Sequence, residues 1–203
     1  MNQFTPPACD AFPLVPRLWH KNGVNGYPQR RRTPRPLNET ALQELALKYV
    51  GRFATSRSKL RSYLSRKVRE RGWDGRSEPD FEGLAGRLAD LGYIDDSAYA
   101  LAKSQSLTGR GYGKRRLDQQ LRLAGIEDED GEAARELAEQ QAVAAALRFA
   151  ERRKIGPFGT EMRDLKGREK AVAAMVRAGH SLGLARTIAG LPPGAPIDPD
   201  NLS

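Results

Sequence analysis

The sequence predicts an all-α protein, and three observations carry that prediction. Apolar residues recur at helical spacing through most of residues 37–191, and no apolar-polar alternation is long enough to predict a strand. Val and Ile, which favour strands, are sparse. Glycine closes one helical stretch after another, at the position where a helix end favours a left-handed residue.

The first three helices follow from their apolar stripes and caps. We expect one helix over residues 39–52 and a second that Ser56 caps and that ends near Arg71. A third helix is expected to begin with Pro79 in its first turn. The three stripes are Leu42, Leu45 and Tyr49; Leu60, Tyr63, Leu64 and Val68; and Phe81, Leu84, Leu88 and Leu91.

The rest of the chain repeats this pattern at intervals of about fifty residues. The capping glycines Gly72, Gly125 and Gly179 lie 53 and 54 residues apart, and ALKYV at 46–50 recurs as ALRFA at 146–150. An apolar pair precedes each of these glycines: Leu64 and Val68, Leu117 and Leu121, and Ala171 and Met175. This predicts three tandem three-helix repeats in an elongated, curved array; chance similarity among Ala/Leu/Arg-rich helices is the alternative. The expected repeats are residues 37–96, 97–140 and 141–191. Residues 132–154 contain neither Pro nor Gly, so they form one helix or two.

The charge of the chain points to an acidic or polyanionic partner. There are 34 Lys and Arg against 25 Asp and Glu, a net charge of +9 over 203 residues. We expect residues 1–36 to form a disordered, basic, Pro-rich arm and residues 192–203 a flexible tail. Residues 37–191 alone hold 28 basic and 22 acidic residues, a net charge of +6. The folded part is therefore basic in its own right, which suits nucleic-acid phosphates or an acidic protein groove.

Basic residues gather on the second helix of each of the first two expected repeats. Residues 57–71 hold seven of them against Glu70, and residues 110–122 hold five against Asp118. The alternative is a solvated surface that keeps the protein soluble. The residues that we expect to contact the partner are Arg57, Arg61, Lys67, Arg110, Lys114, Arg115, Arg116 and Arg122.

No catalytic constellation or metal site is expected. The glycine-rich residues 109–114 precede a helix, but their glycine spacing fails the Walker A pattern and Arg115 replaces its Ser/Thr, so a flexible connector is favoured over a nucleotide site. His180 is interpreted as a partly buried cap residue rather than a catalytic base. Cys9 is the single cysteine, and no apolar run approaches the length of a membrane helix. We expect a cytoplasmic monomer without cofactor, metal or membrane.

The chain resembles the RecX family, bacterial regulators of the RecA recombinase, over residues 41–190. Residues 91–100, LGYIDDSAYA, are similar to the family's G-Y-[LI]-D-D-x-x-[FY]-A junction. Residues 110–117, RGYGKRRL, are similar to its R-x-G-x-x-[RK]-[IL] segment, and AGI at 124–126 to its K-G-I. Ser56, with leucines four and eight residues later, matches its S-x3-L-x3-L helix.

The matched residues have a physical interpretation as a structural motif. Gly92 would end one helix, Tyr93 would fill the seam, and Asp95 or Asp96 would cap the next helix, while Gly125 would end a later one. The chain departs from the family in the basic arm, in one extra helical turn between Ser56 and Gly72, and in having His180 where an aromatic residue is usual.

The resemblance implies a fold of three tandem three-helix repeats and a function in DNA recombination, DNA repair and the SOS response. Its implied partner is the RecA filament on single-stranded DNA, which the protein would enter along the helical groove, limiting filament extension, strand exchange, and ATPase and coprotease activity. Contact with the DNA itself would be indirect or weak. No enzymatic activity is implied. The alternative is a sequence-independent nucleic-acid-binding helical protein; an enzyme is motivated only by the glycine-rich connector.

Overall fold

A computed structural model describes residues 35–202, and these are all-α, as the sequence predicts. One isolated β-bridge joins Leu37 and Trp73, and no strand is present in the described range. The α-helices are α1 (Glu39–Val50), α2 (Arg57–Arg71), α3 (Phe81–Asp90), α4 (Asp96–Gly109), α5 (Lys114–Leu123), α6 (Asp128–Gln140), α7 (Ala142–Arg153), α8 (Leu165–Arg177) and α9 (Leu182–Gly190). Two 3₁₀ turns, η1 (Gly156–Phe158) and η2 (Pro199–Leu202), complete the fold.

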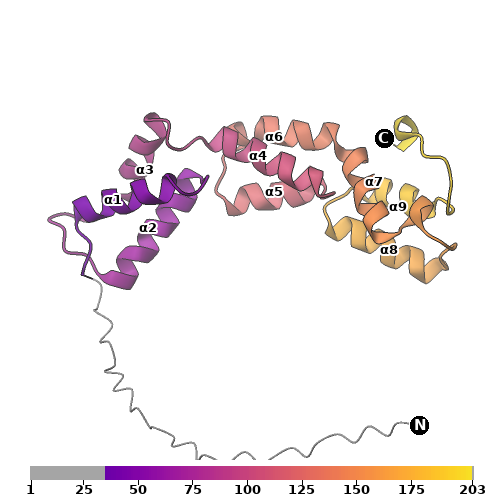
Figure 1. The fold of residues 1–203 in the computed structure, drawn as a ribbon, viewed down its shortest axis with the longest axis horizontal. Coiled ribbons are helices and arrows are strands. Elements are labelled where there is room, and N and C mark those ends of the chain that lie inside the picture. Colours follow the sequence, from indigo (N-terminus) through magenta and orange to yellow (C-terminus); the bar gives the residue numbers. More distant parts are fainter. Residues whose placement is uncertain (1–34, 203) are drawn as a thin grey trace, which may run out of the picture. The chain divides into compact units, whose positions relative to one another are not determined.

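The first core lies among α1, α2 and α3, which Figure 1 shows as one group of helices. The apolar stripe of α2 faces inward, so that Leu60 and Leu64 are fully buried between the other two helices. The rings of Tyr49 and Tyr63 stack with centroids 4.1 Å apart, which ties α1 to α2 beside this core.

The second core lies among α4, α5 and α6, where small residues let two helices approach closely. Ala134 and Ala138 of α6 are buried, and the Ser104 hydroxyl of α4 donates a hydrogen bond to the Ala134 carbonyl at 2.7 Å. Leu117 and Leu121, the predicted stripe of α5, are fully buried in the same core. Three acidic residues in the first turn of α6 stabilise this helix, because their negative charges interact favourably with the positive end of the helix dipole.

The third core lies among α7, α8 and α9 and includes the predicted pair Ala171 and Met175 of α8. Leu202, in the segment that the sequence marks as a tail, is buried against the same core. The Gly194 N–H also donates a hydrogen bond to the Pro157 carbonyl at 2.9 Å. The segment after α9 therefore contacts the helices that precede it.

The structure refines several expected boundaries. The first helix ends at Val50, and residues 132–154 belong to two helices, α6 and α7, which meet at Gln141. The placement of Pro79 in the first turn of the third helix is wrong: α3 begins at Phe81, because the Asp80 carboxylate caps it by accepting the Gly83 N–H at 2.7 Å.

The four expected glycine caps are confirmed by their backbone conformation. Gly72, Gly92, Gly125 and Gly179 all have positive φ, between 62° and 100°. Tyr93 does not fill the seam after Gly92, however, since its side chain is 57% exposed while the following Ile94 is buried. Most of the expected basic arm lies outside the described residues. The division into three equivalent repeats and the curvature of the array stay predictions.

Candidate partner-binding surface

The capping serine of α2 links this helix to the end of α5. Ser56 is fully buried, and its hydroxyl accepts a hydrogen bond from the Lys59 backbone N–H at 3.2 Å. The same hydroxyl donates a hydrogen bond to the Ala124 carbonyl at 2.6 Å. One side chain thus satisfies an unpaired N–H at the start of α2 and an unpaired carbonyl at the end of α5.

Arg57, a predicted contact residue, forms ion pairs with two carboxylates of the protein itself. Its Nε lies 2.7 Å from an Asp96 carboxylate oxygen, and one of its terminal nitrogens lies 2.9 Å from an Asp130 oxygen. The hydrogen bond and the negative charge of Asp96 raise the pKa of Arg57, so the guanidinium stays charged. Asp96 is therefore the ion-pair partner of Arg57, and Asp95 is the residue that caps α4, by accepting the Ala98 N–H at 2.7 Å.

The other predicted contact residues of α2 also have carboxylate partners. Arg61 pairs with Glu82 of α3. The two residues belong to different helices, so the sequence alone does not predict that they meet. Lys67 Nζ lies 2.6 Å from a Glu70 oxygen, one turn away on α2 itself. These pairs reduce the positive charge that α2 presents to a partner.

The glycine-rich connector between α4 and α5 uses its backbone donors within the protein. The Tyr112 N–H bonds the Leu107 carbonyl at 3.0 Å, and the Gly113 N–H bonds the Ala178 carbonyl, also at 3.0 Å. The Arg115 N–H in turn bonds the Gly179 carbonyl at 3.2 Å. These N–H groups are not available to a phosphate, so the connector is a packing junction between α5 and the end of α8.

Beside this junction lies a basic hollow of about 500 Å³, which we call the arginine hollow. Every charged side chain that lines it within residues 35–202 is an arginine, and Tyr112 and Phe149 supply aromatic surface. Its guanidinium groups belong to Arg110, Arg116, Arg152, Arg153 and Arg177. None of the five forms an ion pair with a carboxylate in the described part of the chain.

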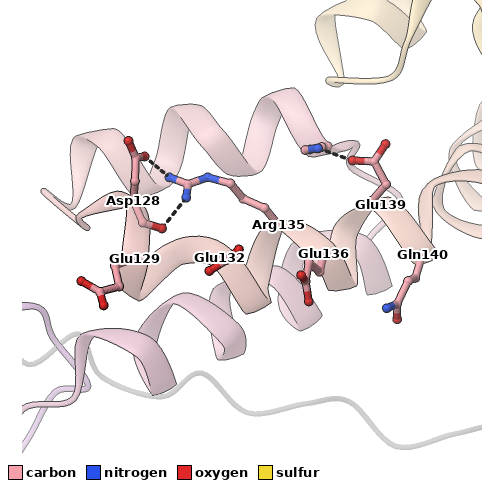
Figure 2. A pocket seen from close by; sticks show the side chains of 8 residues that line it. Asp128, Glu129, Glu132, Arg135, Glu136, Glu139 and Gln140 are labelled. Atoms are coloured by element: carbon pink, nitrogen blue, oxygen red, sulfur yellow. Dashed lines mark hydrogen bonds and ion pairs between the residues drawn. The ribbon is translucent and has the colours of Figure 1, made fainter.

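The remaining predicted residues lie on other parts of the surface. Lys114 pairs with Glu139, at the edge of an acidic groove of about 810 Å³ along α6 (Figure 2). Arg115 is exposed and lines a neighbouring cavity, and Arg122 is exposed near the end of α5. The predicted contact set is therefore divided: Arg110 and Arg116 come together, while Lys114 belongs with the acidic residues of α6.

Two cations line the acidic groove: Lys114, and Arg135, which contacts Asp128 at the N-terminal end of α6. Figure 2 shows Arg135 reaching Asp128, whose carbonyl and carboxylate accept hydrogen bonds at 2.9 and 3.0 Å. Glu129, Glu132 and Glu136 project from the same helix without a cation partner in the described range. Glu129, Glu132 and Glu136 thus lie on one face of α6, whereas Asp130 of the same helix faces Arg57.

Sequence reasoning missed three of the five arginines in the hollow. Arg152 and Arg153 end α7, and Arg177 ends α8. A signal was present for one of them: extending the 46–50 and 146–150 match by two residues aligns Arg52 with Arg152. The other two are marked only as basic residues in the last turn of a helix, which is a common position for them.

His180 is a packing residue at the same junction. It is 2% exposed, its Nε2 lies 3.1 Å from the Gly111 carbonyl oxygen, and its ring centroid lies 5.6 Å from that of Phe149. Burial lowers the pKa of His180, and the hydrogen bond to Gly111 opposes this shift. The neutral imidazole is therefore the form that the folded protein favours.

Residues 35–202 contain neither a metal-binding cluster nor a membrane-spanning helix. No group of three or more His, Cys, Asp and Glu side chains is arranged to hold a metal ion. No helix in this range combines the length and the apolar character that crossing a membrane requires.

The sequence is similar to proteins described as regulatory protein RecX, although no family model matches it. The relative from Myxococcus xanthus (strain DK1622) is 32% identical over 166 residues, which are 76% of this chain and 87% of that protein. The relative from Mycobacterium sp. (strain KMS) is 37% identical over 98 residues, which are 47% of this chain and 51% of that protein.

The fold is similar to that of solved RecX structures. The crystal structure of RecX from Lactobacillus salivarius matches with a TM-score of 0.53 and 20% identity, over 74% of this chain and 94% of that one. A second RecX crystal structure matches with a TM-score of 0.51, also at 20% identity. At this identity the likeness bears on the fold alone.

Proposed function

The chain belongs to the RecX family of regulatory proteins, and from this membership we propose that it regulates the RecA recombinase. The observation that carries the proposal is the 32% identity to a RecX protein over most of both chains. The regulator acts by binding, without catalysing a reaction, and its partner is the RecA filament on single-stranded DNA. It works in the cytoplasm, as a monomer, in DNA recombination and repair.

The mode of action that we propose is inhibition from the groove of the filament. The protein lies across neighbouring RecA protomers and limits filament extension, strand exchange, and ATPase and coprotease activity. Several contacts along one chain add through their linkage, so that each can be weak while the whole binds well. The three successive cores, within residues 37–94, 100–138 and 146–202, support such a division of the chain into contact units.

The proposed contact surface consists of the predicted contact residues whose positive charge no carboxylate of the described chain neutralises. Arg110, Arg115, Arg116 and Arg122 have no carboxylate ion-pair partner in the described part of the chain. The other predicted contact residues are paired with acidic residues of the protein itself. Uncompensated cations attract a polyanionic filament and set the salt dependence of binding.

Charge reversal tests the proposed contact surface. In the full-length chain, changing Arg110, Arg115, Arg116 and Arg122 to Glu should weaken co-sedimentation with RecA–DNA filaments by at least roughly tenfold, because attraction becomes repulsion. A matched control reverses four other exposed cations without a carboxylate partner: Arg52, Lys166, Lys170 and Arg186. Strand exchange should be inhibited by the control protein and the unchanged protein alike, and much less by the variant.

Two results would contradict the proposal at different levels. Equal inhibition by the variant and the control would show that the contact surface lies elsewhere on the protein. Failure of the unchanged protein to bind the filament or to slow strand exchange would overturn the regulatory function itself. Far-UV circular dichroism of all three proteins checks that helix content is unaltered.

A further inference from the structure

The arginine hollow gathers five arginines, and no carboxylate of the described chain neutralises any of them. Its five guanidinium groups come from three separate places: the connector before α5 and its first turn, the end of α7 and the end of α8. No carboxylate lines it within residues 35–202. Like charges gathered on a concave surface repel one another and raise the local potential, so the hollow favours an anionic ligand.

Several of these guanidinium groups are already held in place. Arg110 Nε donates a hydrogen bond to the Ser106 carbonyl at 3.0 Å, and Arg152 donates one to the Arg110 carbonyl at 2.6 Å. Arg110 lies over the Tyr112 ring at 5.8 Å, and Arg152 lies over the Phe149 ring at 5.5 Å. Anchored side chains lose less conformational freedom on binding, and each still has donors left for a ligand.

The charge count favours a ligand with repeated phosphates over one with a single phosphate. A phosphate group carries a charge of at most about −2 near neutral pH, which five guanidinium groups exceed. Guanidinium groups pair bidentately with phosphate oxygens, and they also stack on flat surfaces. The volume of about 500 Å³ lies within the roughly 300–1,000 Å³ of ligand sites, so more than one phosphate can be accommodated.

The aromatic wall favours a nucleic acid over an acidic peptide. Tyr112 is half-buried beside Arg110 and leaves part of its ring at the hollow, where an unpaired base could stack. Carboxylates of a peptide would satisfy the guanidinium groups but would gain nothing from such a ring. Unpaired bases occur in single strands, which this combination of basic groups and aromatic surface suits.

We propose that the arginine hollow binds the sugar–phosphate backbone of single-stranded DNA directly, with a base against Tyr112. The inference goes beyond the proposed function, because it places DNA on this protein without RecA as an intermediary and assigns the contact to Arg152, Arg153 and Arg177 as well as to Arg110 and Arg116. It does not rest on RecA binding.

The test measures binding of a fluorescent oligo(dT) of about twenty nucleotides to the full-length protein without RecA, by anisotropy at several salt concentrations. In one variant Arg152 and Arg177 become Ala. In the matched control Arg52, the repeat counterpart of Arg152, and Arg186 become Ala, which removes the same charge from exposed sites outside the hollow. Circular dichroism shows whether each variant keeps its helices.

The hollow variant should bind the oligonucleotide at least about tenfold more weakly, because two charge-assisted contacts are lost. The slope of log affinity against log salt should become shallower by roughly 1.4, since each phosphate contact to a single strand contributes about 0.7. The control should stay within about twofold of the unchanged protein, because its arginines lie outside the site. Tyr112→Ala should weaken binding without altering the salt slope, because the ring carries no charge.

Three results would overturn the inference. The first is equal weakening in the hollow variant and the control, which would mean attraction by total charge only. The second is displacement of the oligonucleotide by poly-glutamate as readily as by unlabelled oligo(dT), which would assign the hollow to acidic peptides. The third is binding of inorganic phosphate or ADP that the hollow variant loses while its DNA binding is unchanged. All of these results stand apart from whether RecA binds.

Discussion

Replacing Gly179 by Ala tests the junction on which the arginine hollow depends. Gly179 follows α8 with φ of 100°, a backbone conformation that residues with a Cβ rarely adopt. A Cβ at this position would lie 2.5 Å from the Arg116 backbone nitrogen and 2.8 Å from the Gly113 carbonyl oxygen. Both neighbours are backbone atoms held by hydrogen bonds, so neither can move aside without disturbing α5.

The expected magnitude has two parts. The left-handed conformation costs about 1–2 kcal/mol once a Cβ is present. Forcing the Cβ into a packed backbone costs about 1–3 kcal/mol more. The free energy of unfolding should therefore fall by about 2–5 kcal/mol, which corresponds to a melting temperature lower by roughly 4–20 °C in a protein of this size.

Urea unfolding followed by far-UV circular dichroism measures this loss. Gly183→Ala is the control, because Gly183 lies in α9 with nothing within 4 Å of its added Cβ. Alanine there should leave stability unchanged or raise it by up to about 1 kcal/mol. If Gly179→Ala were as stable as the Gly183→Ala control, the tight approach of α5 and α8 would be refuted.

Three further predictions concern the other links between helices. Ser56→Ala should lower the free energy of unfolding by about 2–4 kcal/mol, measured by urea titration, since it removes a cap and leaves the Ala124 carbonyl buried without its donor; a loss below about 0.5 kcal/mol would contradict this. Asp96→Ala should cost about 2–3 kcal/mol, because Arg57 loses its closest carboxylate, and adding Arg57→Ala should cost little more; simple additivity would argue against the pair. Burial lowers the pKa of His180, so below about pH 6.5 the unfolded chain takes up a proton that the folded protein resists. The free energy of unfolding therefore decreases as the pH is lowered. The stability difference between the unchanged protein and His180→Phe should shift towards the variant as the pH drops from about 7 to 5, by at most about 1.4 kcal/mol per pH unit; a pH-independent difference would refute the buried neutral imidazole.

The parts of the fold that depend on local chemistry could be predicted from the sequence. Ser56 caps α2, and glycines in the left-handed conformation end four helices, because both features are decided within a few residues. The apolar spacing that predicts Leu117 and Leu121 as core residues is equally local. Tyr93 shows the limit of such local prediction. It is the large residue after a capping glycine, but in the folded protein Tyr93 is exposed and the next residue, Ile94, is buried.

The parts of the candidate site that depend on distant residues could not be predicted. Arg57 was expected on the partner-binding surface, yet its carboxylate partners lie 39 and 73 residues further along the chain. The arginine hollow likewise joins Arg110 to Arg152, 42 residues away, through a hydrogen bond to a backbone carbonyl. Sequence patterns reveal which residues are charged, whereas the fold decides which charges meet an opposite charge and which stay uncompensated.

Regulation of RecA through its DNA filament is tested most directly by comparing three binding partners under one set of conditions. Co-sedimentation or anisotropy should measure the affinity of the full-length protein for the RecA filament on single-stranded DNA, for the same DNA without RecA, and for RecA without DNA. We predict much tighter binding to the filament than to either component, together with slower strand exchange. Equal affinity for bare DNA and for the filament would contradict this account and would make the protein a general nucleic-acid binder.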